Sequence, residues 1–300
     1  MTPIFSYYGG KQRLVSRLLP LIPNHSVYLE PFCGGATVLF CKPPVFPGNS
    51  DYYREIINDT NADIYNFYKQ MRDNGPDLCR MIELTLYHEK EYKEAVTLYK
   101  SGLGSPLDRA HAFYVNIQMG FANKLNAGWR RSVNSRNEAQ TWANKVDKIR
   151  DYIPRLKYVH ISCTDALTCL KQFSSPQSFA YCDPPYPDTN QGHYSGYTKA
   201  DFAALVDVLD QFQGSFLLSC YDFEGIKVPE NWERYEFKTV MSAARKGSKD
   251  RSVMPDDDNA GDIDRVEIVY RRIAGAKIRD DLKHLVAGQQ TTIFDYMGGK

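Results

Sequence analysis

Five short apolar runs, each ended by a polar residue or a tight turn, limit most strongly how this chain can fold. They cover residues 27–29, 56–57, 158–161, 178–182 and 215–219. Runs of this length are typical of buried β-strands, and several are followed by apolar residues at helical spacing. Two more strands are expected at 235–240 and 266–270. The pattern predicts an α/β fold in which helices flank one sheet.

The strand pattern is interrupted between residues 64 and 157, where helical spacing dominates. Apolar residues recur at that spacing from Asp63 to about Lys100 and again from Ala110 to Phe121. The stretch 122–136 is rich in Asn, Gly, Arg and Ser and is expected to be an exposed loop. We therefore expect a core formed by 1–63 and 158–275, a mostly helical insertion at 64–157, and a C-terminal helix and tail at 276–300.

Composition excludes several classes of protein. With 43% hydrophobic and 24% charged residues, the chain is too apolar to be disordered. No apolar stretch approaches the roughly 18 residues of a membrane span, and the first ten residues lack a signal-peptide pattern. The seven cysteines are irregularly spaced without Cys-x-x-Cys, which indicates neither a disulfide framework nor a zinc site. A cytoplasmic location is the simplest interpretation.

Charge is informative only in its distribution, because the net charge of the whole chain is +1. The stretch 124–157 holds nine basic and three acidic residues, a net charge of +6. Such a stretch suits an anionic polymer such as nucleic acid. A solvated helix face is the alternative interpretation.

The first motif follows the strand at 27–29 and reads Glu30-Pro31-Phe32-Cys33-Gly34-Gly35-Ala36. Glycines at the start of a helix let a ligand approach the backbone closely. Asp59 ends the next strand, 24 residues after Gly35, where a carboxylate can accept hydrogen bonds from ribose hydroxyls. Asp59 as a helix-capping residue is the alternative. Together the two features predict a site for a nucleoside-containing cofactor.

The second motif is Asp183-Pro184-Pro185-Tyr186, directly after the strand at 178–182. The two prolines enforce a rigid, extended turn that holds the Asp183 carboxylate and the Pro184 carbonyl as paired acceptors. Both can accept hydrogen bonds from one exocyclic amino group, which would make its nitrogen more nucleophilic. Tyr186 supplies an aromatic face for a flat base. A proline turn with a capping aspartate is the alternative.

A third motif, Phe5-Ser6-Tyr7-Tyr8-Gly9-Gly10-Lys11, lies near the N-terminus. An aromatic ring, two glycines and a lysine are suited to hold an adenosine ring and a carboxylate. The alternative is a buried aromatic residue beside a solvated lysine.

In this order, the three motifs and Asn58-Asp59 resemble those of the Dam-like DNA adenine-N6 methyltransferases. The resemblance implies a Rossmann-like methyltransferase sheet and S-adenosylmethionine as cofactor. It implies cofactor contacts at Tyr7, Lys11, Glu30, Phe32, Gly34, Gly35, Asp59, Asp165 and Asp183. It also implies a catalytic loop formed by Asp183, Pro184, Pro185 and Tyr186. Ala36 stands where many members of the family have glycine.

The resemblance extends into the insertion, where Asn116, Gly120 and Phe121 are similar to the head of the family's recognition segment. Beyond Phe121 the sequence departs from the Dam pattern. We expect a site-specific enzyme of the restriction–modification type, acting on an adenine flipped out of double-stranded DNA, with no metal. The residues expected to contact DNA are Asn116, Lys124, Arg130, Arg131 and Arg136.

Three other classes remain open at this stage. Cytosine-N4 methyltransferases share the chemistry but usually have serine in place of Asp183. RNA or protein-amide methyltransferases share a similar proline turn, although the basic insertion favours nucleic acid. A catalytically silent DNA-binding relative is the third class, and the presence of Asp183 and Lys11 counts against it.

The C-terminal tail contains Gln290-Thr291-Thr292-Ile293-Phe294, which resembles the peptide by which DNA enzymes bind replication sliding clamps. A glutamine, two small polar residues and two apolar residues form that pattern. A free tail has little reason to expose such apolar side chains. In the alternative interpretation, Ile293, Phe294 and Tyr296 pack on the core as a terminal strand.

Overall fold

The computed structural model describes residues 3–5, 11–12, 14–43, 53–131, 137–187, 196–221, 223, 225, 227–239 and 265–274. Tyr7, Arg136 and the tail with its clamp-like peptide lie outside these residues. In the part of the chain that is described, no helix has the length and apolar character needed to cross a membrane.

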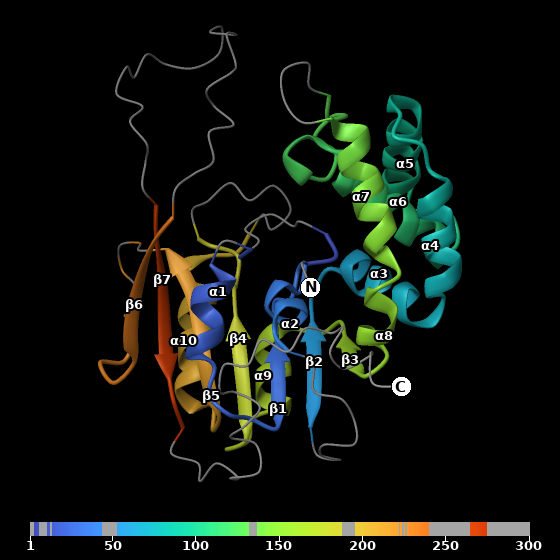
Figure 1. The fold of residues 1–300 in the computed structure, drawn as a ribbon. Coiled ribbons are helices and arrows are strands. Elements are labelled where there is room, and N and C mark those ends of the chain that lie inside the picture. Colours follow the sequence, from blue (N-terminus) through green and yellow to red (C-terminus); the bar gives the residue numbers. More distant parts are fainter. Residues whose placement is uncertain are drawn as a thin grey trace, which may run out of the picture.

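Seven strands form one mixed sheet in the order β3-β2-β1-β4-β5-β7-β6 (Figure 1). The strands are β1 (Val27–Glu30), β2 (Arg54–Asn58), β3 (Val159–Ser162), β4 (Ser178–Cys182), β5 (Ser215–Tyr221), β6 (Glu233–Thr239) and β7 (Arg265–Arg272). The strands β1–β5 run parallel to one another, and β7 is antiparallel to both β5 and β6. The predicted α/β fold with a Rossmann-like sheet is therefore confirmed.

Helices cover both faces of this sheet, as a largely parallel sheet requires. Successive side chains of β1 point to opposite faces, so Tyr28 belongs to one apolar cluster and Leu29 to the other. The first cluster includes residues of α1 (Val15–Leu18), α2 (Thr37–Cys41) and α3 (Ala62–Asp73). The second includes α9 (Ala166–Gln172) and α10 (Lys199–Gln211). The short η1 (Leu19–Leu21) follows α1.

The chain between β2 and β3 is helical and lies beyond the β2–β3 side of the sheet (Figure 1). It comprises α3, α4 (Gly75–Leu84), α5 (Glu89–Ser101), α6 (Pro106–Met119), η2 (Phe121–Asn123), α7 (Glu138–Ile149) and α8 (Tyr152–Leu156). Phe67 of α3 stacks on Tyr114 of α6 with ring centroids 5.6 Å apart. Phe5, from the third motif, packs against Phe67 at 5.3 Å. These helices therefore share one continuous apolar core with a face of the sheet.

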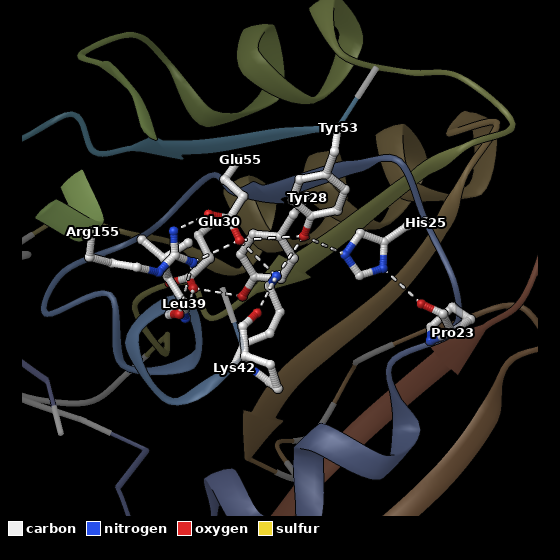
Figure 2. Close-up of polar contacts among 10 residues, drawn as sticks. Pro23, His25, Tyr28, Glu30, Leu39, Lys42, Tyr53, Glu55 and Arg155 are labelled. Carbon is white, nitrogen blue, oxygen red and sulfur yellow. Dashed lines mark hydrogen bonds and ion pairs between the residues drawn. The ribbon is translucent and has the colours of Figure 1, made fainter. Parts of the chain in front are cut away.

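A buried group of charges, which we call the Glu55 cluster (Lys42, Glu55 and Arg155), joins the end of this helical segment to the sheet (Figure 2). Lys42 Nζ lies 2.7 Å from Glu55 Oε1, and the Arg155 guanidinium forms a two-pronged ion pair with the same carboxylate. Arg155 also donates to the carbonyl of Leu39 in α2, at 3.4 Å. One carboxylate of β2 thus fixes both α2 and α8.

Candidate active site

The first two motifs meet where β1 and β4 lie side by side with their carboxyl ends at the same edge of the sheet. The strand order reverses at this point, because β2 and β3 lie to one side of β1 and β4 and β5 lie to the other. Open α/β sheets bind ligands in the crevice at such a switch point. The fold therefore brings the glycine turn after β1 next to the proline turn after β4.

The glycine turn is held by hydrogen bonds from the neighbouring elements. Asp59 Oδ2 accepts from the Gly34 amide at 2.9 Å, and the Tyr68 hydroxyl donates to the Gly34 carbonyl at 3.0 Å. Gly34 and Ala36 both have positive φ, at 45° and 46°. The other carboxylate oxygen of Asp59 accepts from the Asn61 amide at 2.9 Å. Asp59 thus shapes the turn directly, in addition to any contact with a ligand.

Glu30, the first residue of the glycine motif, contacts Tyr28 and Leu39 (Figure 2). Its Oε1 accepts from the Tyr28 hydroxyl at 2.7 Å and from the Leu39 amide of α2 at 2.6 Å. Burial raises the pKa of this carboxyl to about 7, although both hydrogen bonds oppose the shift. Glu30 therefore anchors α2 to β1, which the resemblance did not reveal.

Asp183 directly follows β4, and 21% of its side chain is exposed. Its Oδ1 is 2.9 Å from Lys11 Nζ and 3.0 Å from the Tyr186 hydroxyl oxygen. Burial raises the pKa of Asp183, and the positive charge of Lys11 opposes this rise. Pro184 and Pro185 are buried beside it. The structure thus brings Lys11 of the third motif to the Asp-Pro-Pro-Tyr turn.

Tyr186 differs from its predicted role as an open platform for a base. It is only 5% exposed, Lys11 Nζ lies 4.9 Å from its ring centroid, and the ring of Tyr221 meets it edge-on at 4.4 Å. In this conformation the ring is part of the packed wall of the site. Its aromatic neighbour Tyr221, at the carboxyl end of β5, is half-buried and therefore more exposed than Tyr186.

Phe32 and Asp165, which the resemblance assigns to the cofactor, both lie near Tyr197. Phe32 is half-buried and meets the ring of Tyr197 edge-on at 6.4 Å. The Tyr197 hydroxyl is buried and has no hydrogen-bond partner among the described residues. Asp165 follows β3 and caps α9 by accepting from the Thr168 amide at 2.8 Å. Tyr197 was not predicted from the sequence.

Asn58 is a further residue whose role the sequence did not reveal. Its buried amide donates to the carbonyls of Pro31 and Thr164, both at 3.0 Å, and accepts from the Thr164 amide at 2.9 Å. Asn58 therefore ties together the carboxyl ends of β1, β2 and β3. The only sign of this role in the sequence was the position of Asn58, a polar residue at the end of an apolar strand.

Asn116 was predicted to contact DNA, and its position in the structure corrects that prediction. It is 0% exposed, its amide donates to Asn126 Oδ1 at 3.0 Å, and it accepts from the Asn126 amide at 2.8 Å. Asn126 has a φ of 58°, so this pair stabilises a tight loop. A Cβ at Gly120 would lie 2.5 Å from the Asn116 carbonyl oxygen, which explains the glycine. Asn116 therefore positions the loop.

The arginines that follow this loop differ from one another. Arg130 is held inside by Glu138 at 2.9 Å, by Asn123 Oδ1 at 3.1 Å and by the Gln118 carbonyl at 2.8 Å. Arg131 is exposed, and Lys124 is partly exposed. Phe121, at the start of the loop, is exposed as well. The structure thus favours Arg131 over Arg130 for a contact with a ligand.

The strand order, the glycine turn after β1 and the Asp-Pro-Pro-Tyr turn after β4 together define a methyltransferase that acts on an amino nitrogen. Residues 7–238 match the family model of the D12 class N6 adenine-specific DNA methyltransferases. The chain belongs to this family, and it is an enzyme that methylates N6 of adenine in DNA. The resemblance and the function predicted from the sequence are confirmed.

Its relatives carry names of the same kind. The chain is 24% identical to the DNA adenine methylase of Haemophilus influenzae, over 83% of this chain and 90% of that protein. It is also 24% identical to the Type II methyltransferase M1.LlaDCHI of Lactococcus lactis subsp. cremoris, over 68% of this chain and 72% of that one. Among solved structures, the rRNA methyltransferase aviRa from Streptomyces viridochromogenes aligns over 90% of this chain at 12% identity, with a TM-score of only 0.35.

Proposed function

We propose that the chain transfers a methyl group from S-adenosylmethionine to N6 of a flipped adenine in double-stranded DNA, with Asp183 as the acceptor that orients the amino group. The observation that carries this proposal is the accessible Asp183 carboxylate beside the glycine turn, paired with the buried Lys11 at 2.9 Å. A role in restriction–modification is included, because relatives bear the names Type II methyltransferase and modification methylase.

The residues around the β1–β4 crevice fit S-adenosylmethionine. The Tyr197 hydroxyl is a buried polar atom without a partner in the described part of the chain, and it lies beside Phe32, whose ring suits a flat adenine. Asp59 at the end of β2 suits the ribose, while Gly34 and Gly35 allow close approach of the backbone. When bound, the cofactor supplies an electrophilic methyl group on a sulfonium.

The protein contributes mainly orientation and electrostatics to methyl transfer. Asp183 and the Pro184 carbonyl accept the two amino hydrogens, so the nitrogen lone pair points away from the ring and towards the methyl carbon. As the nitrogen–carbon bond forms, the carbon–sulfur bond would break and leave its electrons on sulfur. The amino nitrogen would then be cationic and lose a proton, for which Asp183 is the carboxylate acceptor. Tyr186 and Tyr221 form the aromatic wall against which the base is held.

The helices α3–α8 form the target-recognition domain in this proposal. The loop after α6 carries the exposed Phe121 and Arg131. Arg131 and Lys124 are assigned to the phosphates, with Arg136 as a third contact outside the described residues. The clamp peptide at 290–294 also lies outside the described residues, and no relative's name supports it, so the sliding clamp stays a sequence-based expectation.

Incorporation of labelled methyl groups into duplex DNA, followed by nucleoside analysis, tests the proposal. We expect the label in N6-methyladenine and nowhere else. Label in N4-methylcytosine, in RNA alone or in protein alone would contradict the proposed substrate. The same assay with Asp183→Ala separates transfer by this site from contaminating activity.

A further inference from the structure

Glu267 is a buried carboxylate that the proposed chemistry has not used. It lies on β7, opposite Tyr221 of β5, and is only 4% exposed. An ionised carboxylate at such depth is costly unless it is paired and hydrogen-bonded. Its partners therefore indicate what it does.

Those partners are the same two side chains that contact Asp183. Glu267 Oε1 lies 2.8 Å from Lys11 Nζ and accepts a hydrogen bond from the Tyr186 hydroxyl at 2.6 Å. Lys11 Nζ is also 2.9 Å from Asp183 Oδ1 and 2.6 Å from the Tyr186 hydroxyl. Asp183 and Glu267 thus share one cation and one hydroxyl.

These shared contacts determine how Lys11 is held once a substrate amino group binds to Asp183. A lysine ammonium has three N–H donors, and Asp183, Glu267 and Tyr186 provide three acceptors for them. An amino group that donates to Asp183 competes with Lys11 for that carboxylate. Glu267 offers the ammonium a second carboxylate, so Lys11 remains anchored while Asp183 engages the base.

The charge of the site follows from the same contacts. With both carboxylates ionised, they and the Lys11 ammonium carry a net charge of −1, whereas Lys11 and Asp183 alone would be neutral. During transfer, the electrons of the carbon–sulfur bond pass to sulfur and the positive charge moves to the amino nitrogen. A fixed negative charge nearby stabilises a cation throughout this step.

We propose that Glu267 is a positioning residue for methyl transfer. It retains Lys11 so that Asp183 is free to accept from the adenine amino group, and it keeps the site negative towards a cationic methyl donor. This inference rests on the proposed function. It differs from the sequence-based assignment, in which only Lys11 and the residues of the catalytic loop were assigned to this part of the site.

The test is Glu267→Gln, which removes the charge with little change in shape. The single-turnover rate at saturating cofactor and DNA should fall at least tenfold, because Lys11 then occupies Asp183. Calorimetry on the DNA-free protein should show that the preference for S-adenosylmethionine over S-adenosylhomocysteine falls about tenfold. These two ligands differ in charge only at sulfur, so a merely structural defect would weaken both equally.

Two further variants serve as controls. Glu236→Gln makes the same charge change at an exposed position of neighbouring β6 and should alter neither quantity. Glu267→Asp keeps the charge but shortens the side chain, so it should slow the reaction while the cofactor preference stays within about twofold. If Glu267→Gln does not fold, Glu267→Asp becomes the test. A Glu267→Asp variant that reacts at the wild-type rate, or that loses the preference for S-adenosylmethionine, would overturn the proposal.

The outcome for the wild-type protein separates this inference from the proposed function. A wild type that neither binds S-adenosylmethionine nor methylates DNA would refute the function itself. A fully active wild type whose Glu267→Gln variant keeps both its rate and its cofactor preference would refute only the role of Glu267.

Discussion

Ala36 has a backbone conformation that residues with a Cβ rarely adopt. Its φ of 46° and ψ of 44° place it in the left-handed region, directly before α2. For a residue other than glycine this conformation costs about 1–2 kcal/mol. The strain lies in the turn assigned to the cofactor, at the position where the family resemblance expects a glycine.

Ala36→Gly should therefore stabilise the protein, by up to about 1 kcal/mol in urea unfolding. The gain is smaller than the relieved strain because glycine also increases the entropy of the unfolded chain. Ala112→Gly, a buried position inside α6, is the matched control and should destabilise by about 1 kcal/mol. Equal losses in both variants would show that Ala36 is not strained.

At the scale of single residues, the sequence identifies a site when the signal is local. Asp183 stands beside two prolines and an aromatic residue, and that combination is visible without a fold. Glu267 looks like one polar residue in a strand, because its contact with Lys11 depends on β7 lying beside β5. Arg130 was expected to contact DNA, but its ion pair with Glu138 depends on how the loop after α6 packs against α7.

Among the elements, α8 depends on the Glu55 cluster for its attachment to the sheet. Arg155→Ala would leave Glu55 paired with Lys42 alone and would remove the donor to the Leu39 carbonyl. Breaking a buried ion pair is strongly destabilising, so we expect a loss on the order of 3 kcal/mol in the free energy of unfolding. Chemical denaturation of the variant measures it.

Arg150→Ala is the control for this prediction. Arg150 pairs with Glu83 at 2.5 Å, but the two side chains are 49% and 35% exposed. Solvent screens such a pair, and the expected loss is below about 1 kcal/mol. A similar loss in the two variants would mean that the buried cluster does not hold α8 in place.

The strands were predictable because their signal is the short apolar run itself. β1, β4 and β5 begin within a residue of the predicted runs. The insertion was predicted as mostly helical, and α3, α4, α5 and α6 fall where apolar residues have helical spacing. No prediction covered α10, although its Thr198–Asp201 capping box and its buried Phe202, Leu205 and Leu209 carry the signal. The sheet order depends on contacts between distant segments, which no local pattern contains.

For the whole molecule, His25 makes stability depend on pH. Its Nδ1 faces the Pro23 carbonyl at 2.7 Å, and Nε2 faces the Tyr53 hydroxyl at 3.3 Å, so the neutral ring suits the site (Figure 2). Burial, with help from Lys42, lowers the pKa of His25 to about 3. The stability due to the neutral ring is therefore present above pH 6.5 and is lost as the pH falls from 6.5 towards 3.

His25→Phe removes this titration while keeping a flat ring against Tyr28, Tyr53 and Phe179. Relative to wild type, the variant should gain on the order of 1 kcal/mol per pH unit as the pH falls from 6.5 to 4.5. Urea unfolding at three pH values measures the difference. Parallel pH profiles for the two proteins would contradict the assignment.

A DNA-binding measurement tests the proposed role of the helical insertion in recognition. Arg131→Ala should weaken binding at low salt and reduce the slope of log affinity against log salt by about 0.9, as expected for one lost phosphate contact. Lys171→Ala, which removes an exposed charge from α9, is the control and should leave the slope unchanged. An unaltered slope in Arg131→Ala would make the insertion a solvated surface instead.

Asp183 is the residue on which the proposed methyl transfer depends most, and one measurement tests its role directly. The single-turnover rate of N6-methyladenine formation is compared between wild type and Asp183→Ala, with cofactor binding and thermal unfolding measured on the same samples. We predict a folded variant that binds cofactor but loses 10²- to 10³-fold in rate, as expected for removal of a preorganised polar group. A folded variant that keeps more than about a hundredth of the wild-type rate would contradict the role assigned to Asp183.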